Sequence, residues 1–350
     1  MSQQLNIYDK RMLIAALEQC YAPKRFLLDT FFKKVKTFLT TKVDIDIKQG
    51  DRNIAAYVHP LEGGRLVENA GFETRTIEPC YTKEFKMINP NDTVTRLFGE
   101  DYSAPMTPAQ REQRLLGEKL TSLDERIVRL EELMAAQALV NGFVYVKGVK
   151  NDYKVDLGYT QGRQKIVLSG DSCWDKGGDP MFDLDEWAET IAERSGLAPT
   201  IIVIGRKVLR ALYNNQKIKD RLDIRNFNVG EISTATSQVL PGGNKGVIYH
   251  GSLAPSNIPI YTYNEKYRNP VTDKIEPLIP DDTVLMGSES AGCIMLYGMI
   301  QNLHSLEARP RFPHTWIEPD GRARYIQLES APLPNLYQVD AFISARVLSN

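Results

Sequence analysis

The residues that could do chemistry are few and widely separated along the chain. The four histidines, His59, His250, His304 and His314, have neither a second histidine at i, i+4 nor a carboxylate at the spacing of a metalloprotease motif. A catalytic or metal site needs several such groups at one place, so we interpret the histidines as ordinary surface or loop residues. We therefore expect no catalytic residue and no metal ligand in this chain.

Three polar segments resemble site motifs only in part. Residues 170–179 place three aspartates four apart, but they match no EF-hand spacing and are interpreted as a polar turn anchored by Trp174. Residues 287–292 lack the G-x-S-x-G order of a nucleophile elbow and predict a turn from the strand 283–286 into a helix. Residues 241–246 lack the spacing of a phosphate-binding loop, and no GxGxxG occurs. We expect no cofactor, and a structural role in place of an enzymatic one.

The element that must organise this chain is a long helix over residues 107–141. Thr107 is a suitable N-cap, Pro108 suits the first helical position, Gln110 completes a capping box, and Gly142 is a natural stop. Its apolar residues recur at spacings of three and four: Leu116, Leu120, Leu123, Ile127, Leu130 and Met134. At 1.5 Å per residue such a helix is about 50 Å long, longer than most globular domains need. It is a rod across which other elements must lie.

The residues before this helix have little core of their own. Residues 9–20 predict a short amphipathic helix, followed by an apolar cluster that contains Phe26, Phe31 and Phe32. Residues 1–42 hold eight lysines and arginines against three carboxylates, and we expect this arm to need another surface. Apolar and polar residues alternate in residues 42–88, which predicts a mostly polar strand–loop–strand segment. This segment must also pack on a neighbour to be stable. Its expected strands are residues 42–48, 54–58, 72–77 and 82–87.

The residues after the long helix predict a mixed α/β lobe. The expected strands are 143–150, 153–157, 165–168, 200–204, 247–249, 258–263, 283–286, 324–329 and 339–347, the expected helices are 183–194 and 206–214, and residues 264–282 form a surface hairpin.

The composition is that of an ordinary soluble protein. The chain has 350 residues, 42% of them hydrophobic and 25% charged, and its net charge of −1 argues against general affinity for nucleic acids or membranes. Cys20, Cys80, Cys173 and Cys293 are scattered, which indicates free thiols in a reducing compartment. Without an apolar signal segment, the chain is expected to be made and kept in a cytoplasm.

The order of these elements resembles one known family. The resemblance covers about residues 8 to 347. Six segments carry it: 26–32 (FLLDTFF), 89–97 (NPNDTVTRL), 219–225 (KDRLDIR), 280–287 (PDDTVLMG), 309–316 (RPRFPHTW) and 327–334 (QLESAPLP). The chain resembles the major capsid proteins of tailed phages, specifically the lambda-like family known as phage capsid protein E. No segment is diagnostic alone; their order makes the match specific.

The resemblance implies an α+β chain with the Hong Kong 97-like (HK97) capsid fold. Four regions follow from it: an N-terminal arm (1–41), an extended β-loop or E-loop (42–95), a peripheral or P domain (96–180 and 306–350) that contains the spine helix 107–141, and an axial or A domain (181–305).

The resemblance also implies a function without catalysis. The chain would be the head protein whose hexamers and pentamers assemble, in the host cytoplasm, into the icosahedral shell of the virion around packaged double-stranded DNA. Scaffolding protein, portal and maturation protease are the implied assembly partners, a decoration protein is an option of the family, DNA is contacted non-specifically, and no membrane is involved. The candidate subunit-contact residues are Phe26, Phe31, Phe32, Glu62, Gly63, Gly64 and Arg65.

Two alternatives remain open from the sequence. An encapsulin-type cellular compartment would share the fold and would need a groove for cargo. A cytosolic α/β enzyme built on residues 180–300 would need a pocket in which titratable groups converge.

Overall fold

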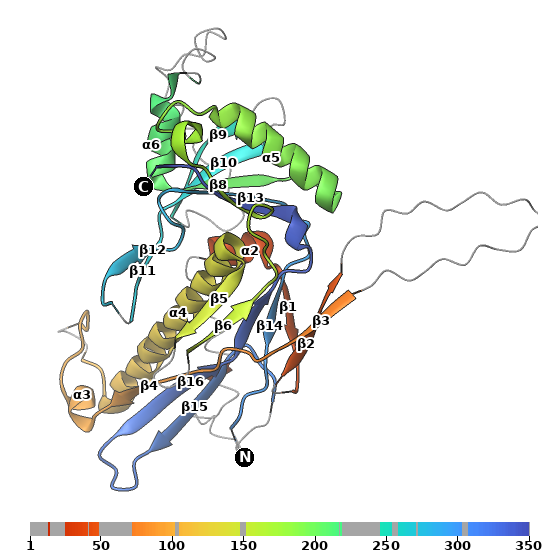
Figure 1. Cartoon of the computed structure of the whole chain (residues 1–350). Helices are drawn as coiled ribbons and strands as arrows, with labels where there is room; N and C mark the ends of the chain where they lie inside the picture. The colour runs from red at the N-terminus through yellow and green to blue at the C-terminus, as the bar shows by residue number, and fades with distance from the viewer. Residues whose placement is uncertain are drawn as a thin grey trace, which may run out of the picture.

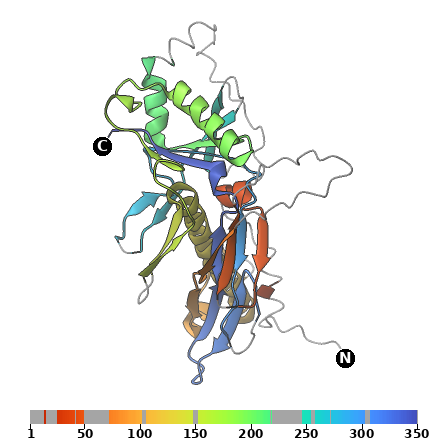
Figure 2. The ribbon, with the colours of Figure 1, turned by 45° about the vertical axis from the view of Figure 1, so that its right-hand side comes forward.

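One long helix, α4 (Pro108–Asn141), runs through the middle of the molecule and joins its two main parts (Figure 1). A sheet with two covering helices lies beyond the C-terminal end of α4, and a second sheet lies along its N-terminal half (Figures 1 and 2). The computed structural model describes residues 13–14, 25–40, 42–48, 72–101, 105–147, 152–216, 218, 246–253, 258–270, 272–302 and 307–349.

The ends of α4 are fixed by the residues that predicted them. The Gln110 backbone N–H donates to Thr107 Oγ1 (3.3 Å), and the Thr107 backbone N–H donates to Gln110 Oε1 (2.9 Å), which completes the capping box. At the other end Gly142 adopts φ +74° and donates to the Ala138 carbonyl. A Cβ at this position would lie 2.1 Å from the Tyr159 side chain, so only glycine fits. The predicted helix is confirmed.

The larger sheet has six strands and separates two layers of helices. Its strands lie in the order β7 (Lys165–Val167), β18 (Phe342–Arg346), β13 (Thr283–Gly287), β8 (Ile201–Ile204), β10 (Ile258–Tyr263) and β9 (Val247–Leu253). Successive residues of β8 point to opposite faces. Ile202 and Ile204 pack under α5 (Pro180–Ser195) and α6 (Arg206–Asn214), whereas Ile201 and Val203 face α4 and α2 (Phe26–Phe31). The centre of this sheet is therefore buried on both faces.

The second sheet supports the N-terminal half of α4. It consists of β15 (Phe312–Ile317), β16 (Arg324–Ser330) and β4 (Thr82–Ile88), all antiparallel, with β16 in the middle. Ile326 and Leu328 of β16 pack against the apolar stripe of α4, which contributes Leu116, Leu120, Leu123 and Ile127. The stripe predicted from the sequence is thus buried against a sheet.

A third sheet, three pairs of strands and a few short helical segments complete the described structure. A three-stranded sheet contains β1 (Lys34–Thr37), which runs parallel to β14 (Ile294–Tyr297), and β17 (Pro332–Asn335). The remaining elements are the hairpins β5 (Phe143–Lys147)–β6 (Asp152–Asp156) and β11 (Lys266–Arg268)–β12 (Ile275–Pro277), the pair β2 (Val43–Lys48)–β3 (Phe72–Ile77), helix α3 (Pro90–Val94), and the 3-10 turns η1 (Gly170–Ser172) and η2 (Val339–Ala341).

Three predicted elements differ from the structure. No helix follows the turn at residues 288–293; β14 follows it, because the chain crosses to another sheet. Asp179, not a residue near Asp183, caps α5, so that helix begins at Pro180. The predicted strand 339–347 is a strand only from Phe342. The predicted strand 54–58, the loop 241–245 and all but two residues of the helix 9–20 lie outside the described residues.

Candidate assembly surfaces

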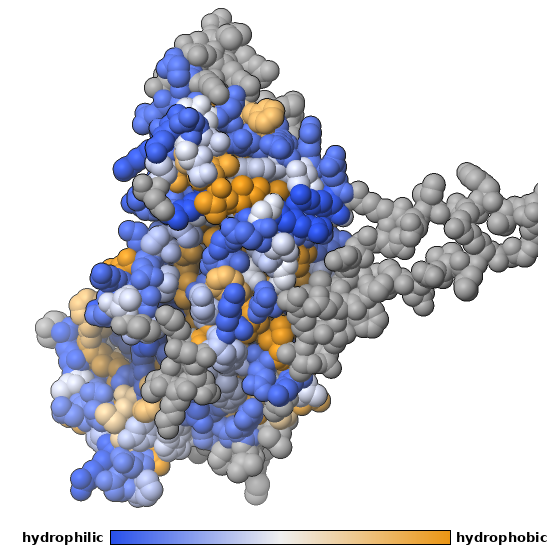
Figure 3. Space-filling model, viewed as in Figure 1, coloured by the Kyte–Doolittle hydropathy of each residue, from blue (hydrophilic) through white to orange (hydrophobic). Residues whose placement is uncertain are grey.

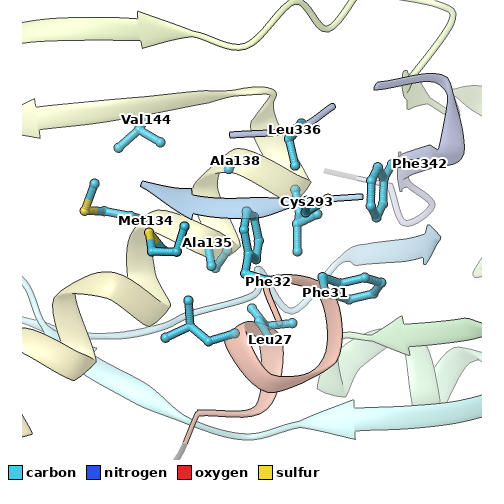
Figure 4. Packing of buried hydrophobic residues seen from close by; sticks show 14 of the residues in the cluster. Leu27, Phe31, Phe32, Met134, Ala135, Ala138, Val144, Cys293, Leu336 and Phe342 are labelled. Carbon is cyan, nitrogen blue, oxygen red and sulfur yellow. The ribbon is translucent and has the colours of Figure 1, made fainter. Parts of the chain in front are cut away.

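The aromatic residues of the arm are buried inside this chain. Phe26, Phe31 and Phe32 are 2–4% exposed and form one core cluster with the C-terminal half of α4 (Figure 4). The Phe31 ring meets the Phe342 ring at 5.5 Å between centroids, and the Phe26 ring meets Tyr263 at 5.3 Å. The sequence predicted that these aromatics need a neighbouring subunit. That prediction is wrong for the three side chains, because residues more than 200 positions downstream complete their pocket.

A buried carboxylate fixes the arm to the spine helix. Glu132 of α4 accepts the backbone N–H groups of Leu27 (2.7 Å) and Leu28 (3.2 Å) at the start of α2, and also the Tyr263 hydroxyl (2.9 Å). Burial raises the pKa of Glu132 to about 7, against the opposing effect of these hydrogen bonds. One side chain therefore holds together α2, α4 and β10.

The preceding residue ties α4 to the strands below it. Glu131 accepts two hydrogen bonds from the Arg311 guanidinium (2.7 and 2.9 Å) and one from the Tyr297 hydroxyl (2.9 Å). Arg311 also donates to Asp124 (2.6 Å). Sequence reasoning missed both glutamates. A signal was present, because Glu131 stands four residues after Ile127 and three before Met134, on the apolar stripe itself.

The pair β2–β3 extends away from the body of the molecule (Figure 1). Its six residue pairs run from Val43–Ile77 to Lys48–Phe72, and within the described residues these two strands pair only with each other. The candidate contact residues Glu62, Gly63, Gly64 and Arg65 lie outside the described residues, so their role stays a prediction.

Other surfaces expose hydrophobic groups or an open sheet edge. The strand β1 is exposed throughout and carries Lys34 and Lys36, which discourage indiscriminate strand pairing. Figure 3 shows hydrophobic residues reaching the surface between the two parts of the molecule and at the corner near α3. The large exposed apolar residues are Val35, Leu39, Tyr81, Phe85, Met87, Val94, Phe98, Tyr145, Val167, Phe182, Tyr213, Ile248, Tyr249, Ile275, Ile317 and Tyr337. Exposed apolar residues of this kind are enriched in protein–protein interfaces where they cluster.

The segments examined for chemistry have structural partners. Trp174 is buried and donates from Nε1 to Asp183 (2.7 Å), Asp175 accepts from Ser349, and Asp179 caps α5, which confirms the polar turn anchored by Trp174. His250 lies 2.6 Å from the Thr262 hydroxyl. In the described part of the chain, no three His, Cys, Asp or Glu side chains are grouped to hold a metal ion.

The thiols that the structure places are free and buried. They are Cys80, Cys173 and Cys293. Burial raises the pKa of Cys80 and of Cys293 to about 12, so neither forms a nucleophilic thiolate near neutral pH. None of the helices in the described ranges has the length and apolar character that crossing a membrane requires.

A spine helix between two sheets, with a projecting pair of strands, is the architecture of the HK97-like fold class. The fold matches that of a prophage protein from Escherichia coli CFT073 described as a capsid protein, with a TM-score of 0.71 at 19% identity over 97% of this chain and 99% of that one. A phage-related protein of Bordetella bronchiseptica RB50 matches with a TM-score of 0.54 at 12% identity, over 98% of both chains.

The sequence comparisons identify the family within that class. Residues 9–347 match the family phage major capsid protein E, and the chain belongs to this family. The chain is 28% identical to the major capsid protein of Escherichia phage lambda and 29% identical to that of Enterobacteria phage P21, in each case over 98% of this chain and 100% of the relative. It is therefore a structural component of the virion, a tailed-phage capsid protein that forms the head shell, and not an enzyme or an encapsulin.

Proposed function

We propose that this chain assembles as hexamers and pentamers that close into an icosahedral head around packaged double-stranded DNA. The observation that carries the proposal is the projecting pair β2–β3. Two isolated strands are at best marginally stable in water, and their open edges favour contact with another chain. A neighbouring copy of the subunit supplies that contact. Residues 62–65 of the E-loop are the residues that we propose touch this neighbour.

The four regions take separate roles in this proposal. The arm (1–41) and E-loop (42–95) contact neighbouring subunits, the P domain (96–180 and 306–350) forms the outer part of each capsomer, and the A domain (181–305) surrounds its axis. Two features refine this division. Helix α2 and Phe32 of the arm pack in the subunit's own core and β1 pairs with β14, and β7 and β18 join the sheet that β8 and β10 form in the A domain.

The assembly also involves other components. A scaffolding protein, a portal and a maturation protease act on the growing shell in the host cytoplasm, and a decoration protein on the outside of the finished head is an option of the family. DNA fills the interior without sequence-specific contacts. The net charge of −1 supports this, because it provides no general attraction to nucleic acid, which is consistent with DNA being held by enclosure.

The proposal is tested with the full chain expressed alone and with the scaffolding protein encoded by the same phage. We expect closed particles, sheets or tubes by negative-stain microscopy and sedimentation. A variant in which a short turn replaces residues 53–67 should keep the circular dichroism and thermal midpoint of the free subunit and lose the particles. A wild-type chain that stays a monodisperse monomer at high concentration, with or without scaffold, would contradict the proposal.

A further inference from the structure

Residues 95–101, which follow α3, are held in place by a buried charge. The Glu100 carboxylate, 3% exposed, accepts the backbone N–H groups of Leu97 (2.9 Å) and Met106 (2.7 Å). It also receives Arg111 Nε (3.0 Å) and Nη2 (2.7 Å). The Arg111 hydrogen bonds hold the pKa of Glu100 down at about 2, so the carboxylate stays charged at neutral pH. This loop is a fixed part of the subunit.

The same loop points a phenylalanine into the solvent. Phe98 is 99% exposed, and Val94, four residues before it, is 69% exposed. Their backbones are fixed even so. The Phe98 carbonyl accepts Arg114 Nη2 (2.9 Å), and the Val94 carbonyl accepts Arg111 Nη1 (3.0 Å). A large apolar side chain on a rigid backbone loses little conformational freedom on binding, which makes it suited to anchor a contact.

A cleft on the same chain has the size and chemistry to receive such an anchor. It has a volume of about 560 Å³ and lies between α4, the start of β4 and the β11–β12 hairpin. Ile127, Leu130 and Leu133 contribute the apolar side chains of its lining. Arginines line it as well: Arg126 pairs with Glu84 (2.6 Å), Arg268 pairs with Asp273 (2.7 Å), and Arg129 has no ion-pair partner in the described ranges.

We propose that Phe98 of one copy inserts into this cleft of another copy, with its ring against the leucines and beneath the Arg129 guanidinium. Apolar burial and a cation–π contact favour this occupant. A contact within one chain is excluded, because Arg111, which holds the loop, and Arg129 are separated by 18 helical residues, about 27 Å. Since two different patches meet, the contact can repeat from copy to copy in a shell. The inference rests on the self-assembly of this family.

The contact is tested by crosslinking two differently tagged subunits that are assembled together. One carries Val94→Cys, which leaves Phe98 in place, and the other carries Pro270→Cys at the exposed rim of the cleft. A short bismaleimide should join the two tags in particles and leave them separate in free subunits. Val167→Cys, also an exposed apolar position, replaces Val94→Cys in the control and should give no crosslink to Pro270→Cys.

A second pair of variants measures what the anchor contributes. Phe98→Ser should raise the concentration needed for assembly at least about tenfold, with an unchanged melting temperature of the free subunit. Phe182→Ser, at a phenylalanine that is 64% exposed on α5, should leave that concentration unchanged. Normal assembly of Phe98→Ser would overturn the inference. So would a defect in Phe98→Ser assembly combined with no crosslink between Val94→Cys and Pro270→Cys, which would show that another group occupies the cleft. A wild-type chain that never assembles would instead contradict the proposed function.

Discussion

At the scale of single residues, two adjacent glutamates explain how α4 joins the parts of the subunit. Glu131 faces Arg311 and Tyr297, and Glu132 faces the N-terminus of α2 and Tyr263. Both are buried, so each charge depends on the hydrogen bonds that surround it. Glu131 has a full cation as its partner. Glu132 has only neutral donors, which is why burial raises its pKa.

The raised pKa of Glu132 predicts a specific pH dependence of stability. Its ordinary pKa is 4.5, and its folded value is about 7, so between these values the folded chain binds a proton that the unfolded chain has released. The free energy of unfolding should therefore fall as pH rises from about 4.5 to 7, by up to about 3 kcal/mol. Glu132→Gln should remove this slope in urea unfolding of the free subunit.

The matched control is Glu125→Gln, at an exposed position of the same helix. It should retain the wild-type slope. If Glu132→Gln also retained that slope, the pH dependence would have to come from another group.

At the scale of elements, the sequence predicted those whose signals are local. The capping box at Thr107 and the glycine at 142 stand directly at the two ends of α4, and the alternation in 42–48 lies within its own strand. The strand β1 was missed because KVKT is exposed on every residue and pairs with β14, 260 positions away. Pro332 and Pro334 argue against a strand, yet β17 contains both, because it lies at the edge of its sheet.

The packing of α4 on the β15–β16–β4 sheet gives a prediction for the helix. Leu123 is 1% exposed between α4 and the strands, so Leu123→Asp should bury an unpaired charge and cost several kcal/mol. Particle yield in sedimentation should fall to background. Circular dichroism of the soluble fraction should still show the lobe of α5, α6 and the six-stranded sheet, which has its own apolar cluster.

Glu125→Ala is the control for this experiment, two residues further along and exposed. It should assemble normally. A normal particle yield from Leu123→Asp would mean that this stripe is not the support of the helix.

At the scale of the whole molecule, the surfaces of contact were the part of the structure that the sequence predicted least well. The aromatics of the arm were expected to wait for a neighbour because no local partner exists for them. Their partners are Tyr263 and Phe342, which no pattern near residue 26 could indicate. The cleft between α4 and β11–β12 was missed for the same reason, because its lining comes from three distant segments.

The burial of the arm predicts how a free subunit responds to proteases. The sequence analysis expected the arm to need another surface, and an arm without one would be cut readily in free subunits. From the structure we expect trypsin to spare Lys33, Lys34 and Lys36, because α2 is buried on one side of them and β1 pairs with β14. Mass spectrometry of the early fragments checks this.

Phe31→Leu provides the comparison, since it loosens the contact with Phe342 while keeping an apolar side chain. It should increase cutting at the three lysines. Equal and rapid cutting in the wild-type and variant subunits would show that the arm is not anchored in solution.

The contact between Phe31 and Phe342 also determines when the arm can be fully buried during translation. The ribosome makes Phe31 early and Phe342, the last wall of its pocket, near the end, and at 5–20 residues per second the ~310 residues between them take roughly 15–60 s. Throughout that interval the phenylalanines and leucines of α2 are incompletely covered, and transiently exposed apolar surface of this kind is what chaperones bind. A chain released before residue 342 cannot close this pocket. The fold thereby discriminates between complete and truncated products before either can join a shell.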